Sequence, residues 1–196
     1  MRIRVDGKTV VVSGAGHGFG RCIAETFAQL GARVFGCDLS AAELAETATV
    51  GVKTEVLDLT DRGAAAAWIA RIEQTTGGAV DVLVNNAGGV AEQEMQPIEE
   101  VSDANWDRIF AVNIGAAFAL SRAVAGGMKR AGSGRIVNIS SGAGQTRGGR
   151  VDATTGARAG AIRDHRQQRG AGFRSLQCGI GKAVVGVRRG RAKGAG

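Results

Sequence analysis

Short apolar runs alternate with segments of helical periodicity along the first three quarters of the chain. In the helical segments, apolar residues recur every three or four positions, as on one face of a helix. The predicted strands are Thr9–Ser13, Arg33–Cys37, Val52–Leu57, Val80–Val84 and Arg135–Ile139. The predicted helices are Phe19–Leu30, Ala41–Ala48, Arg62–Thr75 and Asp103–Met128. This alternation predicts a doubly wound α/β fold, with helices on both faces of a parallel sheet and a ligand crevice at the carboxyl ends of the strands.

The segment between the first strand and the first helix, GAGHGFG, is rich in glycine. Gly14, Gly18 and Gly20 allow a tight turn and let backbone amides approach a pyrophosphate at the positive end of the helix. A glycine-rich turn can also exist for steric reasons alone. Because this one follows a strand and opens a helix, it favours a dinucleotide-binding sheet of the Rossmann type.

An acidic residue, Asp38, ends the second predicted strand at the spacing that this fingerprint requires. Its carboxylate is expected to accept the ribose hydroxyls of the dinucleotide. The alternative is that Asp38 only begins the next helix, with Ser40 as the cap. A carboxylate at this position repels a 2′-phosphate, so NAD is the expected cofactor and NADP is disfavoured.

Three further motifs follow in order: NNAG at Asn85–Gly88, Asn113 within FAVNIGAAF, and NISS at Asn138–Ser141. Together with the glycine loop, they resemble the classical short-chain dehydrogenase/reductases, whose bacterial members include 3-oxoacyl carrier-protein reductases and many alcohol or sugar dehydrogenases. The resemblance covers about residues 6–146. It implies a homotetrameric or dimeric protein that acts on a small carbonyl or alcohol substrate.

The resemblance also implies which residues border the cofactor. Beside the glycines and Asp38, the expected cofactor contacts are Phe19, Leu39, Asp58, Leu59, Asn86, Ala87 and Gly88. Two structural alternatives stay open. Asp58 can simply cap the next turn, and the Asn-Asn pair can be a turn held by its own side-chain bonds. No metal ligand is expected, and His17 and His165 are interpreted as surface residues.

The chemistry implied by the resemblance is hydride transfer between the nicotinamide and a carbonyl or alcohol carbon. In this family a tyrosine is the acid or base, a lysine lowers its pKa, a serine steadies the substrate oxygen and an asparagine holds a relay water. Ser141 matches the serine and Asn113 the asparagine. Ser140 is the neighbour of Ser141, and either hydroxyl can instead cap the end of a strand.

The expected tyrosine is missing, because the chain contains none. In the family's usual register its position holds Thr154 and the lysine position holds Arg158. An aliphatic hydroxyl titrates far above a phenol and cannot exchange protons near neutral pH. Cys178 and Lys182 have the same spacing, but they lie too far downstream. The alternative function is therefore a catalytically inactive nucleotide-binding remnant.

Charge divides the chain near Gln145. Residues 1–146 carry 13 basic and 16 acidic residues, whereas residues 147–196 carry 12 basic and 2 acidic residues and 12 of the 32 glycines. We therefore interpret 1–146 as the NAD-binding domain and 147–196 as an aberrant, poorly ordered Arg/Gly-rich tail. A nucleic-acid-binding arm is disfavoured because Phe173 is the tail's only aromatic residue.

The genetic code offers an explanation for this tail. Permitted codons for Ile162–Gln177, read one base later, give SGITVNNVAPGFVRSN, which resembles the family's stretch after the catalytic lysine. We therefore expect a frameshift near Gln145–Gly148, with a deletion that removed the Tyr and Lys codons. The resulting open edge on the fifth strand would impair assembly.

Location and the role of the cysteines follow from composition. No apolar run is long enough to cross a membrane and the N-terminus lacks a signal-peptide pattern, so a cytoplasmic protein with no membrane partner is expected. The three cysteines, Cys22, Cys37 and Cys178, are interpreted as small core residues.

Overall fold

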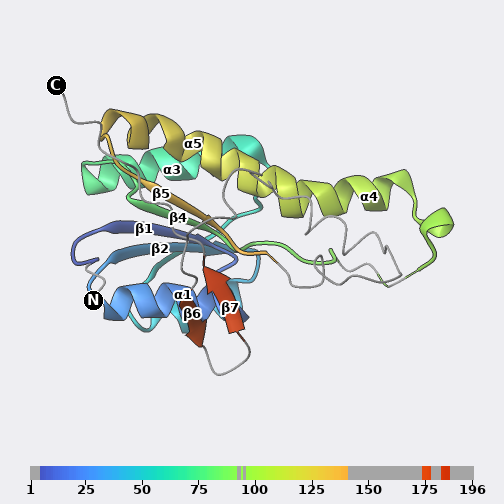
Figure 1. The fold of residues 1–196 in the computed structure, drawn as a ribbon, viewed down its shortest axis with the longest axis horizontal. Coiled ribbons are helices and arrows are strands. Elements are labelled where there is room, and N and C mark those ends of the chain that lie inside the picture. The colour runs from blue at the N-terminus through green and yellow to red at the C-terminus, as the bar shows by residue number, and fades with distance from the viewer. Residues whose placement is uncertain (1–4, 92–93, 95, 141–173, 178–181, 186–196) are drawn as a thin grey trace.

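A five-stranded parallel sheet forms the centre of the molecule (Figure 1). The computed structural model describes residues 5–91, 94, 96–140, 174–177 and 182–185. The strands are β1 (Thr9–Ser13), β2 (Arg33–Asp38), β3 (Lys53–Val56), β4 (Val82–Asn85) and β5 (Arg135–Asn138), in the spatial order β3-β2-β1-β4-β5. The strand order reverses between β1 and β4. The predicted doubly wound α/β sheet is thus confirmed.

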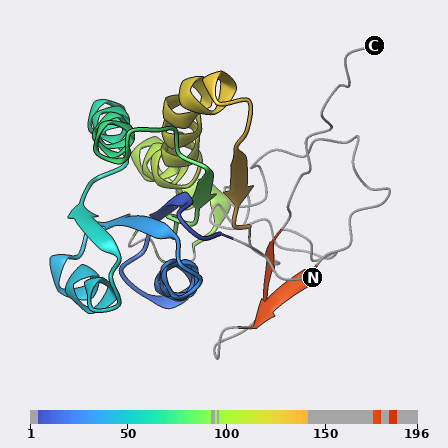
Figure 2. The same cartoon turned by 90° about the vertical axis from the view of Figure 1, so that its left-hand side faces the viewer.

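Helices cover both faces of the sheet (Figure 2). On one side lie α1 (Gly18–Gln29) and α2 (Ala41–Ala48), and on the other lie α3 (Arg62–Thr76) and α5 (Ala116–Arg130). The core is divided by the sheet in the same way. One cluster of buried residues contains Trp68 of α3 and Leu120 of α5, and the other contains Ala24 of α1 and Leu44 of α2.

Local sequence signals place the helix ends close to the predicted bounds. Ser40 and Asp61 are N-caps whose side chains accept hydrogen bonds from first-turn amides of α2 and α3. Gly77 ends α3 in the left-handed conformation, with φ of 67°. These caps depend on short-range contacts, which explains why sequence patterns locate them well.

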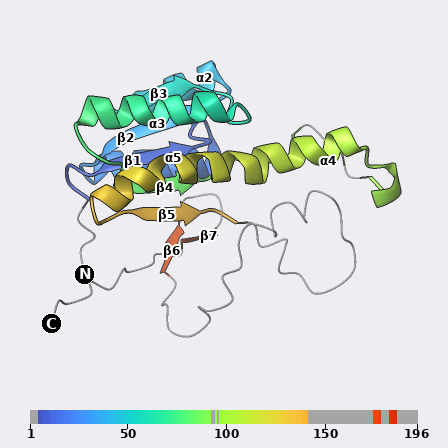
Figure 3. The same ribbon diagram turned by 90° about the horizontal axis from the view of Figure 1, so that it is seen from above.

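The long helix predicted from Asp103 differs from the expectation. It is built from α4 (Asp103–Phe110), the π-helical turn η2 (Ala111–Gly115) and α5, and it ends at Arg130. A 3₁₀ turn, η1 (Ile98–Glu100), precedes it. Apolar periodicity cannot distinguish a π turn from an α turn, because one extra residue shifts the pattern by less than a full turn. The amino-terminal part, α4, projects beyond the carboxyl ends of the strands (Figure 3).

The same helix bears on the expectation that no apolar run is long enough to cross a membrane. Its 28 residues, Asp103–Arg130, are long and apolar enough to cross a membrane by length and composition. Alanines raise its mean hydropathy without forming an obvious apolar run, which is why the sequence pattern did not reveal it. In this fold α5 packs against α3, and its Leu120 and Val124 are fully buried.

The C-terminal part contains a strand pair that was not expected, and the burial of one cysteine also differs from the expectation. Strands β6 (Arg174–Gln177) and β7 (Lys182–Val185) pair antiparallel in a separate two-stranded sheet, where the sequence pattern predicted no strand. Among the cysteines, Cys37 is fully buried but Cys22 is only half-buried, and Cys178 lies outside the described residues.

Replacing Leu120 with alanine tests the packing of α5 against the sheet. Leu120 has no exposed surface, so Leu120→Ala is expected to lower the free energy of unfolding by about 2–5 kcal/mol through lost burial and a new cavity. Urea denaturation of the full chain measures the change. The control is Phe118→Ala on the same helix, expected to cost about 1 kcal/mol because the side chain is 52% exposed. Equal losses in the two variants would contradict this packing.

Candidate functional site

Several of the predicted site residues gather where the strand order reverses. In a parallel sheet, all carboxyl ends lie at one edge, and here Ser13, Asp38, Asn85 and Asn138 end β1, β2, β4 and β5. The crevice of an open α/β sheet lies outside these ends, at the reversal between β1 and β4. The loops that follow these strands therefore decide what the edge can bind.

The glycine loop is packed so tightly that it admits no side chain at two positions. A Cβ atom on Gly20 would lie 1.7 Å from the carbonyl oxygen of Gly14, and one on Gly14 would lie 2.9 Å from Cα of Ala87. Gly14 and Gly18 also have φ of 65° and 53°, a region that favours glycine. The fit between the start of α1 and the loop thus depends on missing Cβ atoms.

The amino end of α1 is open to a ligand. His17 is the N-cap, and its side chain makes no capping hydrogen bond within the part of the chain that the structure describes. Phe19, in the first turn, is 37% exposed. Helix-start amides that no side chain satisfies carry partial positive charge and suit an anionic group such as a diphosphate.

Asp38 lies directly at this loop. Its Oδ2 accepts a hydrogen bond from the Gly16 amide at 2.9 Å, and its Oδ1 accepts one from the Leu39 amide at 2.7 Å. Ser40, not Asp38, caps α2, since its hydroxyl accepts from the Glu43 amide at 3.3 Å. The two interpretations of this segment are therefore divided between two residues, with Asp38 facing the glycine loop and Ser40 capping the helix.

Hydrogen bonds join the NNAG motif to the end of β1 and the glycine loop. The Asn86 side-chain amide donates to the carbonyl oxygens of Ser13 and Gly14, at 3.2 and 3.0 Å. The Ser13 hydroxyl accepts from the amides of Asn86 and Ala87, both at 3.0 Å. Ser13 was not predicted as a site residue. The only signal for it was a serine at the end of an otherwise apolar strand.

Asn85 links three elements beneath this loop. Its side-chain amide donates to Ser121 Oγ of α5 at 3.1 Å and to Asn138 Oδ1 of β5 at 2.8 Å. Its own Oδ1 is buried and has no hydrogen-bond partner within the described part of the chain. Asn85 and Asn138 also pair in the β4–β5 register.

Asn113 holds the chain just after NNAG. It lies in the π-helical turn, where its side-chain amide donates to the carbonyl oxygens of Gly89 at 2.8 Å and Ile109 at 2.9 Å. Its Oδ1 accepts from the Gly89 amide at 3.1 Å. Asn113 is thus brought to the site, where it clamps the loop of Gly88 and Gly89. Ser141, the other predicted catalytic residue, lies outside the described residues.

The structure shows the turn-capping alternative at Asp58. Its Oδ1 accepts from the amide and the hydroxyl of Thr60, at 2.9 and 2.7 Å. Leu59 is 8% exposed and belongs to the core cluster under α3, whereas Leu39 is 68% exposed beside Asp38. The adenine contacts of Asp58 and Leu59 and the cofactor contact of Leu39 stay predictions.

Cys37 lies beneath the loop and takes no part in acid–base chemistry. Burial raises the pKa of its thiol to about 12, against the opposing effect of a hydrogen bond with the Gly14 backbone. The thiol is therefore neutral at physiological pH, and it acts as a small apolar residue under the turn.

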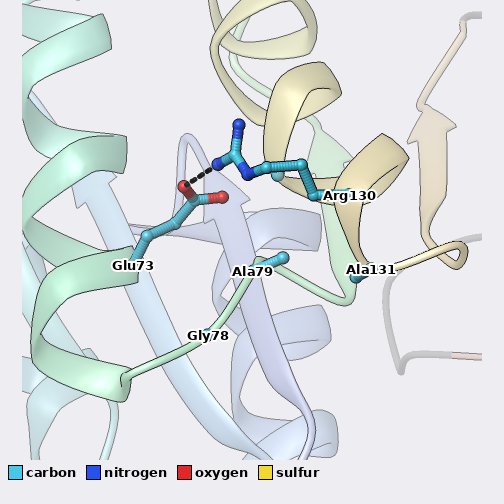
Figure 4. Close-up of a pocket in the computed structure, with 6 residues that line it drawn as sticks. Glu73, Gly78, Ala79, Arg130 and Ala131 are labelled. Atoms are coloured by element: carbon cyan, nitrogen blue, oxygen red, sulfur yellow. Dashed lines mark ion pairs between the residues drawn. The ribbon is translucent and has the colours of Figure 1, made fainter.

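A pocket at the other end of the sheet is separate from this site (Figure 4). It is formed between the ends of α3 and α5, and its lining includes Glu73 and Arg130, whose side chains pair at 3.8 Å. None of the predicted site residues lines it. The glycine loop and its neighbours therefore remain the candidate site.

Comparison with known proteins agrees with this architecture. The chain is 35% identical over 147 residues to sorbitol dehydrogenase of Cereibacter sphaeroides, covering 73% of this chain and 56% of the relative. It is 34% identical over 160 residues to a 3-oxoacyl acyl-carrier-protein reductase of Escherichia coli (strain K12), covering 80% and 64%. The crystal structure of a short-chain dehydrogenase from Streptomyces avermitilis matches with a TM-score of 0.71 at 31% identity, covering 79% of this chain and 56% of that one.

The extent of these matches is also informative. The chain spans about half the length of the first curated relatives, 56% and 54% of sorbitol dehydrogenase and D-threitol dehydrogenase. The model of the family described as short chain dehydrogenase matches residues 8–163, which extends past the predicted boundary at 146. With this match over most of its length and the fold and motifs above, the chain belongs to the short chain dehydrogenase family.

Proposed function

We propose that this chain binds NAD(H) across the β1–β4 crevice, as the cofactor domain of an oxidoreductase that acts on a small carbonyl or alcohol substrate. The observation that carries the proposal is the contact of Asp38 with the Gly16 amide at 2.9 Å. It holds a carboxylate beside a glycine loop that opens a helix, the arrangement in which amides bind a diphosphate and the acid binds a ribose.

The lining of the crevice fits the cofactor. The cradle that excludes Cβ atoms at Gly14 and Gly20 lets a diphosphate reach the backbone, while Phe19, Leu39 and Asp58 border the adenosine. The NNAG loop, held by Ser13 and Asn113, supports the nicotinamide half through Asn86, Ala87 and Gly88. A charged carboxylate at Asp38 disfavours the 2′-phosphate of NADP, so we propose NAD as the preferred cofactor.

The reaction proposed for this family member is hydride transfer, and the bound nicotinamide supplies the hydride or accepts it. Asn113 holds the loop beside the nicotinamide, and Ser141 steadies the substrate oxygen. The relatives named sorbitol dehydrogenase and 3-oxoacyl acyl-carrier-protein reductase support an alcohol or carbonyl as the reacting group.

A second candidate function is nucleotide binding without catalysis, and one observation favours it. The chain has no tyrosine, so no phenol is available to exchange a proton with the substrate oxygen. We propose that a frameshift near 145–148 and a deletion removed this residue and its lysine. We also propose that 147–196 is an aberrant tail, that the protein is cytoplasmic, and that its assembly is impaired. The nucleotide sequence of codons 140–180 tests the frameshift.

Substitution of Gly20 tests the cradle. Gly20→Ala is expected to raise the Kd for NAD at least about tenfold, because the new methyl group collides with the Gly14 carbonyl and displaces the helix-start amides. Calorimetric titration measures it. The matched control is Gly78→Ala, where a Cβ meets nothing within 4 Å. Unchanged NAD binding by Gly20→Ala would contradict the assigned cradle.

Substitution of Asp38 tests the preference for NAD. Asp38→Asn keeps an acceptor for the Gly16 amide but removes the charge, so the Kd for NAD is expected to rise about 10- to 100-fold while the Kd for NADP falls relative to it. The control is Asp81→Asn, a carboxylate that pairs with Lys8 at 2.8 Å before β4 begins. The same NAD:NADP ratio in wild type and Asp38→Asn would refute the ribose role.

Turnover by the chain as given decides between the two candidate functions. Because the family's acid–base tyrosine is absent, we expect NADH to bind without measurable oxidation. The carbonyl substrates to be tested are ketoses, the oxidised counterparts of polyols such as sorbitol, and 3-oxoacyl thioesters. Absorbance at the nicotinamide band follows the reaction, with an intact family member as the positive control. Substrate-dependent loss of NADH would rule out the inactive remnant.

A further inference from the structure

One imidazole and two carboxylates meet beside the glycine loop. The ligating atoms of His17, Asp38 and Glu43 all lie within 4.8 Å of one another. They come from the glycine loop, the end of β2 and the first turn of α2. His17 Nδ1 lies 3.0 Å from Glu43 Oε2. Residues distant in sequence are thus gathered by the fold, which explains why sequence patterns predicted no metal ligand here.

The donor set matches the preferences of zinc. Zn²⁺ binds imidazole nitrogen and carboxylate oxygen at about 2.0–2.2 Å in tetrahedral geometry, which places its ligand atoms about 3.4 Å apart. The observed separations are close enough for small side-chain rotations to reach this value. The side chains of His17 and Glu43 are 71% and 41% exposed, so an ion can enter from solvent and a water can complete the coordination.

Neighbouring groups orient the ligands and leave them accessible. The two backbone amides that bind Asp38 fix the plane of its carboxylate and leave lone pairs on both oxygens. The Arg21 guanidinium lies close by, but it donates to the carbonyl oxygens of Gly16 and Glu43 and pairs with Glu46. It therefore occupies none of the three ligand atoms.

We propose that His17, Asp38 and Glu43 form a Zn²⁺ site and that zinc bound there competes with NAD. The competition rests on the proposed function, because Asp38 is the residue assigned to the ribose. A zinc ion on its carboxylate occupies the lone pairs that the ribose hydroxyls need. The site makes cofactor binding sensitive to free zinc.

Zinc binding is tested on the full chain without an affinity tag. Titration with ZnCl₂ is expected to show one site, and His17→Gln and Glu43→Gln are each expected to weaken it at least tenfold. His165→Gln is the matched control and keeps the wild-type affinity. Substitution by Co²⁺ is expected to give visible bands of nitrogen and oxygen ligation without a thiolate charge-transfer band. Zinc affinity that is unchanged in both variants, or a thiolate band, would overturn the site.

Competition is tested by titrating NAD at increasing zinc concentration. The apparent Kd for NAD is expected to rise linearly with free zinc in wild type, with a slope at least tenfold smaller in Glu43→Gln. Zinc binding without an effect on NAD would overturn the competition. Absence of NAD binding, with zinc binding still lost in His17→Gln, would overturn the proposed function and leave the metal site supported.

Discussion

The candidate site depends on the close approach of the glycine loop to the two strands on either side of it. On the β2 side, the Gly16 amide binds the Asp38 carboxylate. On the β4 side, Asn86 reaches back to the carbonyl oxygens of Ser13 and Gly14. Both approaches require the absence of Cβ atoms, since one on Gly16 would lie 2.9 Å from Cγ of Asp38. The loop is therefore fixed before any ligand arrives, which reduces the entropy that binding would otherwise cost.

This arrangement also separates binding from chemistry along the chain. The glycine loop, Asp38 and NNAG lie within residues 14–88 and form a continuous cradle at one sheet edge. Asn113, from the long helix, holds the chain after NNAG through two hydrogen bonds with the Gly89 backbone. In the proposed function, the groups that would exchange protons with a substrate belong to later positions, where the family register predicts Thr154 and Arg158. The organisation of the glycine loop therefore does not depend on the positions to which we assign the chemistry.

Much of this could be predicted from sequence, because it depends on local patterns. Apolar runs located all five strands of the parallel sheet, and the glycine spacing with Asp38 located the crevice. The tertiary bonds of Ser13 and Thr47 were not predictable: Thr47 Oγ1 donates to the Ala15 carbonyl at 2.8 Å across 32 residues, and no spacing rule encodes that contact. The π turn at Asn113 and the cluster of His17, Asp38 and Glu43 were not predicted for the same reason. Both depend on how separate elements pack.

The most direct test of the central claim is an experimental structure of this chain with NAD at saturating concentration. We expect the diphosphate at the start of α1 and the adenosine ribose hydroxyls within hydrogen-bond distance of the Asp38 carboxylate. A dinucleotide bound elsewhere, or a ribose remote from Asp38, would contradict it.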